Sequence, residues 1–218
     1  MHTYTISNDI RKKVTVTIFV ISMLISLILN LLLGNILNQL IAYLKTMDEL
    51  NTCIEFVEFL KIDLNFFGVP VLYGLFTGLY EKYIWKCAFM KKIHNVPDLN
   101  GEWEGYLQSS FNYKEKIPMK MKIKQTWDKI SFKSIFPKSV SYSNVAAINV
   151  DGPYGIEISF GFKNDSYCME DNMPTYYGYN ILKLEANNKI KARYCNDRNN
   201  HNIGYNGGNK GIFELEKK

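Results

Sequence analysis

Three side chains able to bind an anion or a base recur at every second position near the C-terminus: Tyr194, Asn196 and Arg198. Positions two apart in a β-strand point to the same side of the sheet. These side chains would therefore share the inward face predicted for Ile190 and Ala192. An arginine that points inward needs an anionic partner, because an unpaired buried charge is very costly.

Two kinds of anion could satisfy Arg198. The first is a carboxylate of the protein itself, for which Glu214 and Asp197 are the candidates. The second is a phosphate or carboxylate of a ligand, which the guanidinium binds through two parallel hydrogen bonds. Aromatic side chains could add stacking faces for a base. The predicted ligand-binding residues are Tyr194, Asn196, Arg198, Trp103 and Tyr176.

The sequence contains no recognisable catalytic or metal-binding motif. Its four cysteines form no Cys-x-x-Cys pair, and its three histidines have no metal-ligand spacing. It lacks a Ser-His-Asp set, a phosphate-binding glycine loop and a dinucleotide fingerprint. We therefore expect no metal, no cofactor and no enzymatic activity. The net charge of +5 comes largely from lysines that flank apolar segments, so it does not indicate DNA or RNA binding.

The second half of the chain has the period-two pattern of β-strands. In residues 117–127, methionine and isoleucine at odd positions alternate with lysine at even ones. Eight such segments are predicted, at residues 103–111, 117–127, 130–136, 142–150, 156–162, 176–185, 190–194 and 213–215. Short strands with tight turns favour an antiparallel up-and-down, lipocalin-like β-barrel, because closure removes exposed edges. About eight strands enclose side chains or one small ligand.

The N-terminal part predicts two transmembrane helices. Residues 14–33 carry no charge and are long enough to cross a bilayer. Residues 64–80 are also uncharged, and membrane helices tolerate their glycines and proline. A cleaved signal peptide and a buried core helix are the respective alternatives. Basic residues at 11–13 and 82–92 place both termini in the cytoplasm.

Two features of this hairpin concern its contacts. Residues 47–60 have helical apolar spacing. This spacing predicts either a short amphipathic helix, at the outer membrane surface or capping the hairpin, or an ordinary solvated helical turn. Gly74 and Gly78 permit close approach of the first span or of another protomer. The predicted domains are a transmembrane hairpin with a short amphipathic connection at 1–95 and a ligand-sensing barrel at 96–218.

Four segments carry a resemblance to a known family. They are PDLNGEWEGYL at 97–107, IKQTW at 123–127, FGFKN at 160–164 and YCNDR at 194–198. Coming after two predicted spans, they resemble the two-transmembrane β-barrel effectors of bacterial CBASS anti-phage defence. This sequence departs from the family pattern at two points: it has Asn196 where the family often has threonine, and it has no proline after Asn164-Asp165.

The resemblance implies that a cytoplasmic barrel binds a cyclic di- or trinucleotide made by a cGAS/DncV-like nucleotidyltransferase. It further implies a homo-oligomer that disrupts the lipid of the bacterial inner membrane and causes abortive infection. Two alternatives stay open: a membrane-tethered lipocalin-like carrier or sensor of an apolar ligand, and a hydrolase with carboxylates at the barrel mouth. Polar groups at the mouth favour the effector, whereas a wholly apolar lumen favours the carrier.

Overall fold

The computed structural model describes residues 1–7, 9–46, 51–110, 112–153, 155–166, 175–185, 188–198 and 208–218. The chain divides into two compact units. One consists of Met1–Asn8 together with Trp85–Lys218, and the other of Asp9–Ile84. In this division the first eight residues belong with the barrel and not with the long helices that follow them.

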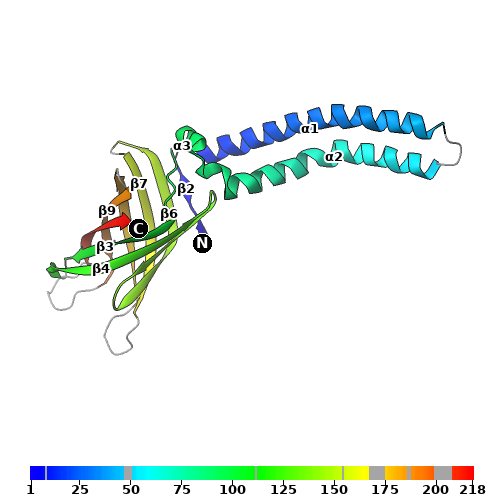
Figure 1. Ribbon diagram of the computed structural model, residues 1–218. Coiled ribbons are helices and arrows are strands. Elements are labelled where there is room, and N and C mark those ends of the chain that lie inside the picture. The colour runs from blue at the N-terminus through cyan, green and yellow to red at the C-terminus, as the bar shows by residue number, and fades with distance from the viewer. Residues whose placement is uncertain are drawn as a thin grey trace. The chain divides into compact units, whose positions relative to one another are not determined.

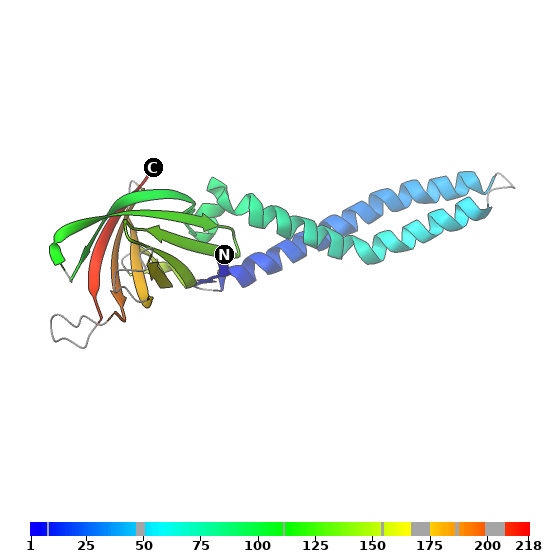
Figure 2. The same cartoon turned by 90° about the horizontal axis from the view of Figure 1, so that it is seen from below.

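Eight strands form the wall of the barrel. They are β3 (Gly101–Ser109), β4 (Asn112–Gln125), β5 (Lys129–Ile135), β6 (Ser139–Gly152), β7 (Gly155–Ser166), β8 (Tyr176–Glu185), β9 (Lys189–Asn196) and β10 (Lys210–Lys217). Each pairs antiparallel with the next, and β10 pairs with β3 (Figures 1 and 2). The predicted closed, eight-stranded up-and-down barrel is confirmed.

Inward apolar side chains pack the barrel from its middle to one end, here called the floor, where β3 begins and β4 ends. Trp103, Met121, Phe132, Phe160 and Phe213 are each at most 1% exposed. The rings of Phe132 and Phe160 stack in parallel with centroids 4.1 Å apart. Burial of a large apolar side chain of this kind stabilises the fold by about 1.5–3 kcal/mol.

Two short helical segments and the chain after them cover the floor. These segments are η1 (Ile84–Lys86) and α3 (Ala88–His94). Trp85 and Leu99 are 0% exposed. The Trp127 ring lies with its centroid 6.3 Å from that of Trp85 and 5.0 Å from that of His94. This packing closes one end of the barrel.

The Asp-Leu-Asn-Gly run at 98–101 fastens this cover to the end of β4. Asn100 Oδ1 accepts from Gln125 N at 2.7 Å, and Asn100 Nδ2 donates to Gln125 O at 2.9 Å. Leu99 N donates to Gln125 Oε1 at 2.9 Å. Gly101 has a φ of +129°, a conformation that side-chain-bearing residues rarely adopt. The most recognisable motif of the sequence therefore builds the floor.

The chain before the first long helix forms two further strands that the sequence pattern did not predict. β1 (His2–Thr3) pairs antiparallel with β5, and β2 (Thr5–Ile6) pairs parallel with β6. Residues 2–7, here called the N-terminal strap, thus lie along both β5 and β6. Strands of two residues are too short to show a period of their own.

The second unit consists of α1 (Ile10–Leu44) and α2 (Asn51–Lys82). Within the described residues, one helix, α1, is long and apolar enough to cross a membrane. The second predicted span covers residues 64–80, and some of its side chains are not among those that the structure describes. That this segment crosses a membrane therefore stays a prediction. Residues 47–50 also lie outside it. The helical part of the predicted amphipathic connection begins at Asn51 and continues into α2 without a break.

The two helices contact each other through small side chains. Ser22 is 0% exposed and Ser26 is 9% exposed. A Cβ atom added at Gly68 would lie 2.8 Å from Ser26 Oγ, so a larger residue there would push the helices apart. By contrast, a Cβ at Gly74 or Gly78 meets nothing within 4 Å. That glycine pair does not mediate the α1–α2 contact, so its face is open to another partner.

Candidate ligand-binding site

A cavity of about 380 Å³ opens at the end of the barrel opposite the floor, here called the mouth. This luminal cavity falls within the roughly 300–1,000 Å³ typical of small-molecule sites. Its lower wall is apolar, including Leu107, Met119 and Phe213. The polar and charged lining residues are Ser109, Glu115, Ser134, Lys138, Ser139, Ser141, Tyr176, Asn180, Tyr194, Asn196, Arg198 and Asn209.

Strand register brings the predicted residues of the late segment to this cavity. Tyr194 of β9 lies opposite Asn180 of β8, and Asn196 lies opposite Gly178. Residues directly opposite in an antiparallel pair share one face, so the inward direction predicted for Tyr194 and Asn196 is confirmed. Arg198, two residues beyond the end of β9, lines the same cavity.

Two glycines make room for inward-pointing rings. A Cβ at Gly178 would overlap the Phe162 ring, and one at Gly211 would overlap the Tyr194 ring. Each ring therefore lies against a stretch of wall that has no side chain. This arrangement keeps bulky aromatic groups at the side of the lumen instead of across it.

Arg198 lies over an aromatic ring and makes no ion pair with either predicted partner. Its Cζ is 5.9 Å from the centre of the Tyr176 ring. Asp197 Oδ1 accepts from Tyr177 N at 2.8 Å, and Glu214 Oε2 accepts from the Tyr106 hydroxyl at 3.2 Å. Of the two alternatives for Arg198, pairing with Glu214 or Asp197 is therefore not the one that the structure has, because both carboxylates bond elsewhere on exposed parts of the barrel.

Asn196 and Tyr176 lie beside Arg198 in the mouth. Asn196 Oδ1 accepts from Arg198 N at 3.3 Å and from Asn209 N at 3.0 Å, which leaves its NH₂ group to donate elsewhere. Burial raises the pKa of Tyr176 to about 12, although the positive charge of Arg198 opposes the rise. The Tyr176 hydroxyl is therefore neutral at physiological pH. The mouth presents an amide, a phenol and a guanidinium.

The sequence argument missed a set of buried polar side chains in the lumen. Ser109, Ser134, Ser139, Ser141, Asn164, Asn180 and Asn209 are all at most 9% exposed. Ser141 Oγ donates to Asn164 Oδ1 at 2.7 Å. A usable signal was present, because serine or asparagine takes the inward positions at the mouth end of strands whose other inward positions are apolar.

Trp103 does not reach this cavity. It lies six residues before Ser109 on β3, at the floor, with 1% of its surface exposed. Its indole Nε1 donates to Leu99 O at 3.0 Å. The structure thus places four of the five predicted ligand-binding residues around one cavity and the fifth in the core.

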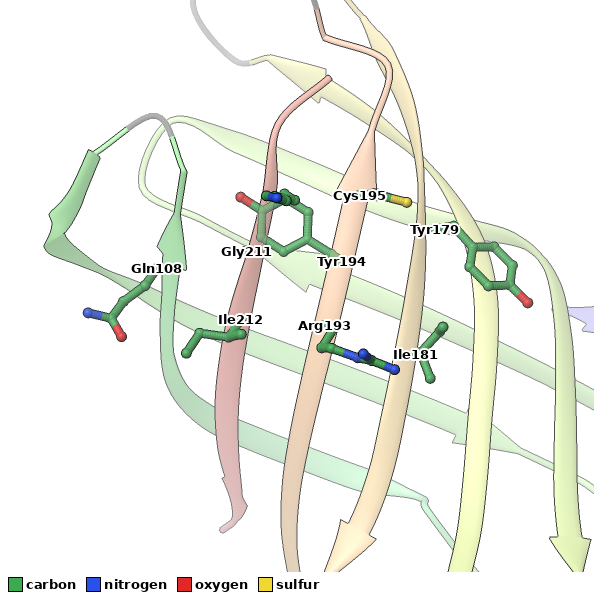
Figure 3. Close-up of a pocket in the computed structure, with 9 residues that line it drawn as sticks. Gln108, Tyr179, Ile181, Arg193, Tyr194, Cys195, Gly211 and Ile212 are labelled. Carbon is green, nitrogen blue, oxygen red and sulfur yellow. The ribbon is translucent and has the colours of Figure 1, made fainter. Parts of the chain in front are cut away.

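A second cavity, the outer groove, of about 430 Å³, lies on the outer surface of β8, β9, β10 and β3 (Figure 3). Tyr179, Ile181, Arg193 and Ile212 line it, and Tyr194 borders both cavities. Tyr179 and Ile212 are 43% and 50% exposed. In the described part of the chain, no group of three or more His, Cys, Asp or Glu side chains could hold a metal ion. Between the two cavities, the luminal one is the better candidate, because strand walls surround it.

Comparison with known proteins identifies the family of the barrel part of the chain. The model of the family "Cap15, cyclic dinucleotide receptor domain" matches residues 94–207, more than half of the 218-residue chain. The chain belongs to this family. The Cap15 match covers the floor, most of the barrel wall and the mouth, and it confirms the resemblance to CBASS effectors.

Two curated relatives carry the name CD-NTase-associated protein 15. The protein from Yersinia aleksiciae is 26% identical over 137 residues, which cover 60% of this chain and 65% of the relative. The protein from Escherichia albertii is 26% identical over 135 residues, which cover 56% of this chain and 69% of the relative. The chain thus spans just under two thirds of the Yersinia relative.

Proposed function

We propose that this Cap15-family chain is a CBASS effector whose luminal cavity binds a cyclic dinucleotide. Binding promotes homo-oligomerisation, and the N-terminal helices then disrupt the bacterial inner membrane. In this proposal a cGAS/DncV-like nucleotidyltransferase supplies the ligand, and cell death limits phage growth. The barrel acts as a receptor and not as an enzyme.

One observation carries the ligand part of the proposal: Arg198 projects into a polar, half-enclosed lumen without pairing to Asp197 or Glu214. A phosphodiester is the anion that fits, because guanidinium binds it bidentately. Tyr176 and Tyr194 offer ring faces, and Asn180 and Asn196 offer amides that can pair with base edges. A carrier of apolar ligands would need an apolar lumen, which this polar lining opposes.

The N-terminal strap supports the membrane part of the proposal. Residues 2–7 pair with the barrel, so the chain before α1 and the chain after α2 lie on one side of any membrane. If α1 crosses the bilayer, the chain must cross back before Trp85. α2 is the segment available for this return, which agrees with the span predicted at 64–80. The basic flanks of the two helices support a cytoplasmic position for the barrel.

The test is calorimetric titration of the full-length protein in detergent micelles with 3′,3′-linked cyclic dinucleotides, and with a cyclic trinucleotide for comparison. We expect one saturable site for a cyclic dinucleotide and no heat from the matching linear dinucleotide. Binding of retinoids or fatty acids, with no cyclic nucleotide bound, would support the carrier instead.

A further inference from the structure

We infer that the N-terminal strap transmits occupancy of the luminal cavity to α1. This inference rests on the proposed function and names how the same site controls its output. It arises from the place where the barrel wall is weakest, between β5 and β6.

The β5–β6 ladder has three pairs of residues: Lys133 with Tyr142, Ser134 with Ser141, and Ile135 with Val140. Beyond it the two strands part. Phe132 N donates to the side-chain oxygen of Ser143 at 2.9 Å instead of to a backbone carbonyl. The wall therefore forks at Ser143, and closing the rest of it requires another segment.

The N-terminal strap fills this fork. His2 Nε2 lies 2.7 Å from Ser143 Oγ, where the ladder stops. Tyr4 is 3% exposed, and its hydroxyl donates to Thr126 O and accepts from Gln125 Nε2, both at 3.3 Å. Ser7 N donates to Ile148 O at 3.1 Å, and Ser7 Oγ accepts from Val150 N at 3.0 Å. The strap thus bonds to both sides of the fork.

The luminal cavity borders the base of the same fork. Ser134 and Ser141 line the cavity and face each other in the short ladder. A ligand that bonds to either serine acts on the last pairs that hold β5 and β6 together. A change in the spacing of the two strands must change the site into which the strap fits.

A movement of the strap has a short path to α1. Ser7 is separated from Ile10, the first residue of α1, by residues 8 and 9 alone. Asp9 O already accepts from Lys13 N at 3.1 Å, so it begins the helical bonding. A connection this short cannot absorb a displacement as a long flexible linker would. The strap is therefore a mechanical link between receptor and membrane helix.

The experiment lengthens this link. A Gly-Ser-Gly-Ser insertion after Ser7 preserves the strap, the cavity and α1. Full-length protein is placed in phosphatidylethanolamine–phosphatidylglycerol vesicles, and dye release is followed as 3′,3′-cyclic dinucleotides are added. We expect the insertion to leave the Kd within about twofold and to reduce ligand-dependent dye release at least tenfold. The same insertion after Lys218 is the control and should release dye normally.

A second pair of variants tests the strap itself. Tyr4→Ala removes a buried ring together with the hydroxyl that bonds to Gln125 and Thr126. Thr5→Ala alters an exposed position of the same segment. We expect Tyr4→Ala to uncouple binding from dye release and Thr5→Ala to behave as wild type. Amide exchange at Ser7, measured on wild-type protein, should change several-fold when ligand saturates the site.

The outcomes separate this inference from the proposed function. Full dye release by the insertion variant, or an unchanged exchange rate at Ser7 in ligand-saturated wild type, would overturn the strap as the link. Wild-type protein that binds no cyclic nucleotide would overturn the proposed function first.

Discussion

We propose that ligand affinity depends on Arg198 more than on any other described side chain of the mouth. Hydrogen bonds to charged groups contribute about 1.5–3 kcal/mol, so Arg198→Ala should weaken cyclic-dinucleotide binding by about 10- to 150-fold. The thermal midpoint should change little, because Arg198 makes no ion pair with Asp197 or Glu214. Calorimetry and circular dichroism measure the two effects. Arg193→Ala, on the outer groove, is the matched control. Unchanged affinity in a folded Arg198→Ala protein would contradict the site.

Trp103 should affect stability and not affinity. Trp103→Phe removes the indole N–H that bonds to Leu99 O and leaves a ring in the core. We expect the free energy of unfolding to fall by about 1–3 kcal/mol, as for a buried acceptor left without its donor. Affinity per folded molecule should stay at the wild-type value. A large loss of affinity with an unchanged melting curve would show instead that Trp103 contributes to ligand binding.

His94 should make the floor sensitive to mild acid. Its Nδ1 accepts from Val96 N at 3.0 Å and its Nε2 lies 3.1 Å from Trp85 O, an arrangement that suits the neutral ring. Burial is the main cause that lowers the pKa of His94, and the nearby positive charge of Lys91 lowers it further. The hydrogen bond to the Trp85 carbonyl acts in the opposite direction. Below the ordinary value of about 6.5, the unfolded chain therefore binds a proton that the folded chain does not. Stability is fully present above that value and declines as the pH falls below it.

The measurement for His94 is the tryptophan-fluorescence melting temperature at pH 7.5 and pH 5.5. We expect a larger fall for wild type than for His94→Gln, which lacks the titrating ring. The other two histidines are present in both proteins, so they cancel in this comparison. Equal falls in both proteins would show that His94 does not govern the acid response.

Single-residue predictions succeeded where only the side of a strand mattered. Period two is a rigid property of strands, so the inward direction of Tyr194 and Asn196 followed from the sequence. Depth along the lumen did not follow, because it depends on how strands align with one another. That is why Trp103 was assigned to the ligand although it lies at the floor, and why Asn180 was missed.

The face of α2 that carries Gly74 and Gly78 can be tested as a contact between protomers. Gly74 and Gly78 lie away from α1, whereas Gly68 packs against Ser26. Gly74→Leu combined with Gly78→Leu should therefore leave the hairpin intact and reduce ligand-driven assembly. Contacts of this kind are individually worth about 1 kcal/mol, which suits a switch that stays off without ligand. Light scattering of detergent-solubilised protein with and without cyclic dinucleotide measures the effect.

Gly68→Leu is the contrasting variant for this prediction. It should separate α1 from α2, because a Cβ at this position already crowds Ser26 Oγ. We expect it to lower the yield of folded protein, which the double variant should not do. Ligand-driven growth in particle size that persists in the double variant would exclude the Gly74–Gly78 face from assembly.

The elements differ in how far the sequence predicts them. All eight wall strands follow from their alternating pattern, since each is long enough to show it. The N-terminal strap was not predicted, because its strands have two residues each and show no alternating pattern. They are strands because they pair with β5 and β6 on the two sides of the fork. The pattern at 47–60 predicts a short amphipathic helix or a solvated helical turn. The described part of that segment, from Asn51, instead belongs to α2, because no proline or glycine interrupts the helix before Gly68.

The arrangement of the whole chain across a membrane is a prediction that fusions can test. Because the strap binds the barrel, both chain ends should lie on the same side of the membrane, and the basic flanks predict that this side is the cytoplasm. Asn51 should then lie on the opposite side. A cytoplasm-active reporter fused after Lys218 should be active, and the same reporter inserted at Asn51 should be inactive. An inactive fusion at Lys218 would exclude sensing of a cytoplasmic ligand.

In the part of the chain that the structure describes, the packed floor closes one end of the lumen, and the cavity opens at the mouth. A ligand must leave by the path along which it entered, so the residues of the mouth govern both the association and the dissociation rate constants. If the cavity binds an anion as proposed, Arg198 and Lys138 at this opening should attract it on entry and slow its departure. The duration of the signal in each molecule is then a residence time set at the mouth. After a brief pulse of messenger, each receptor would therefore stay in the ligand-bound state for about that residence time.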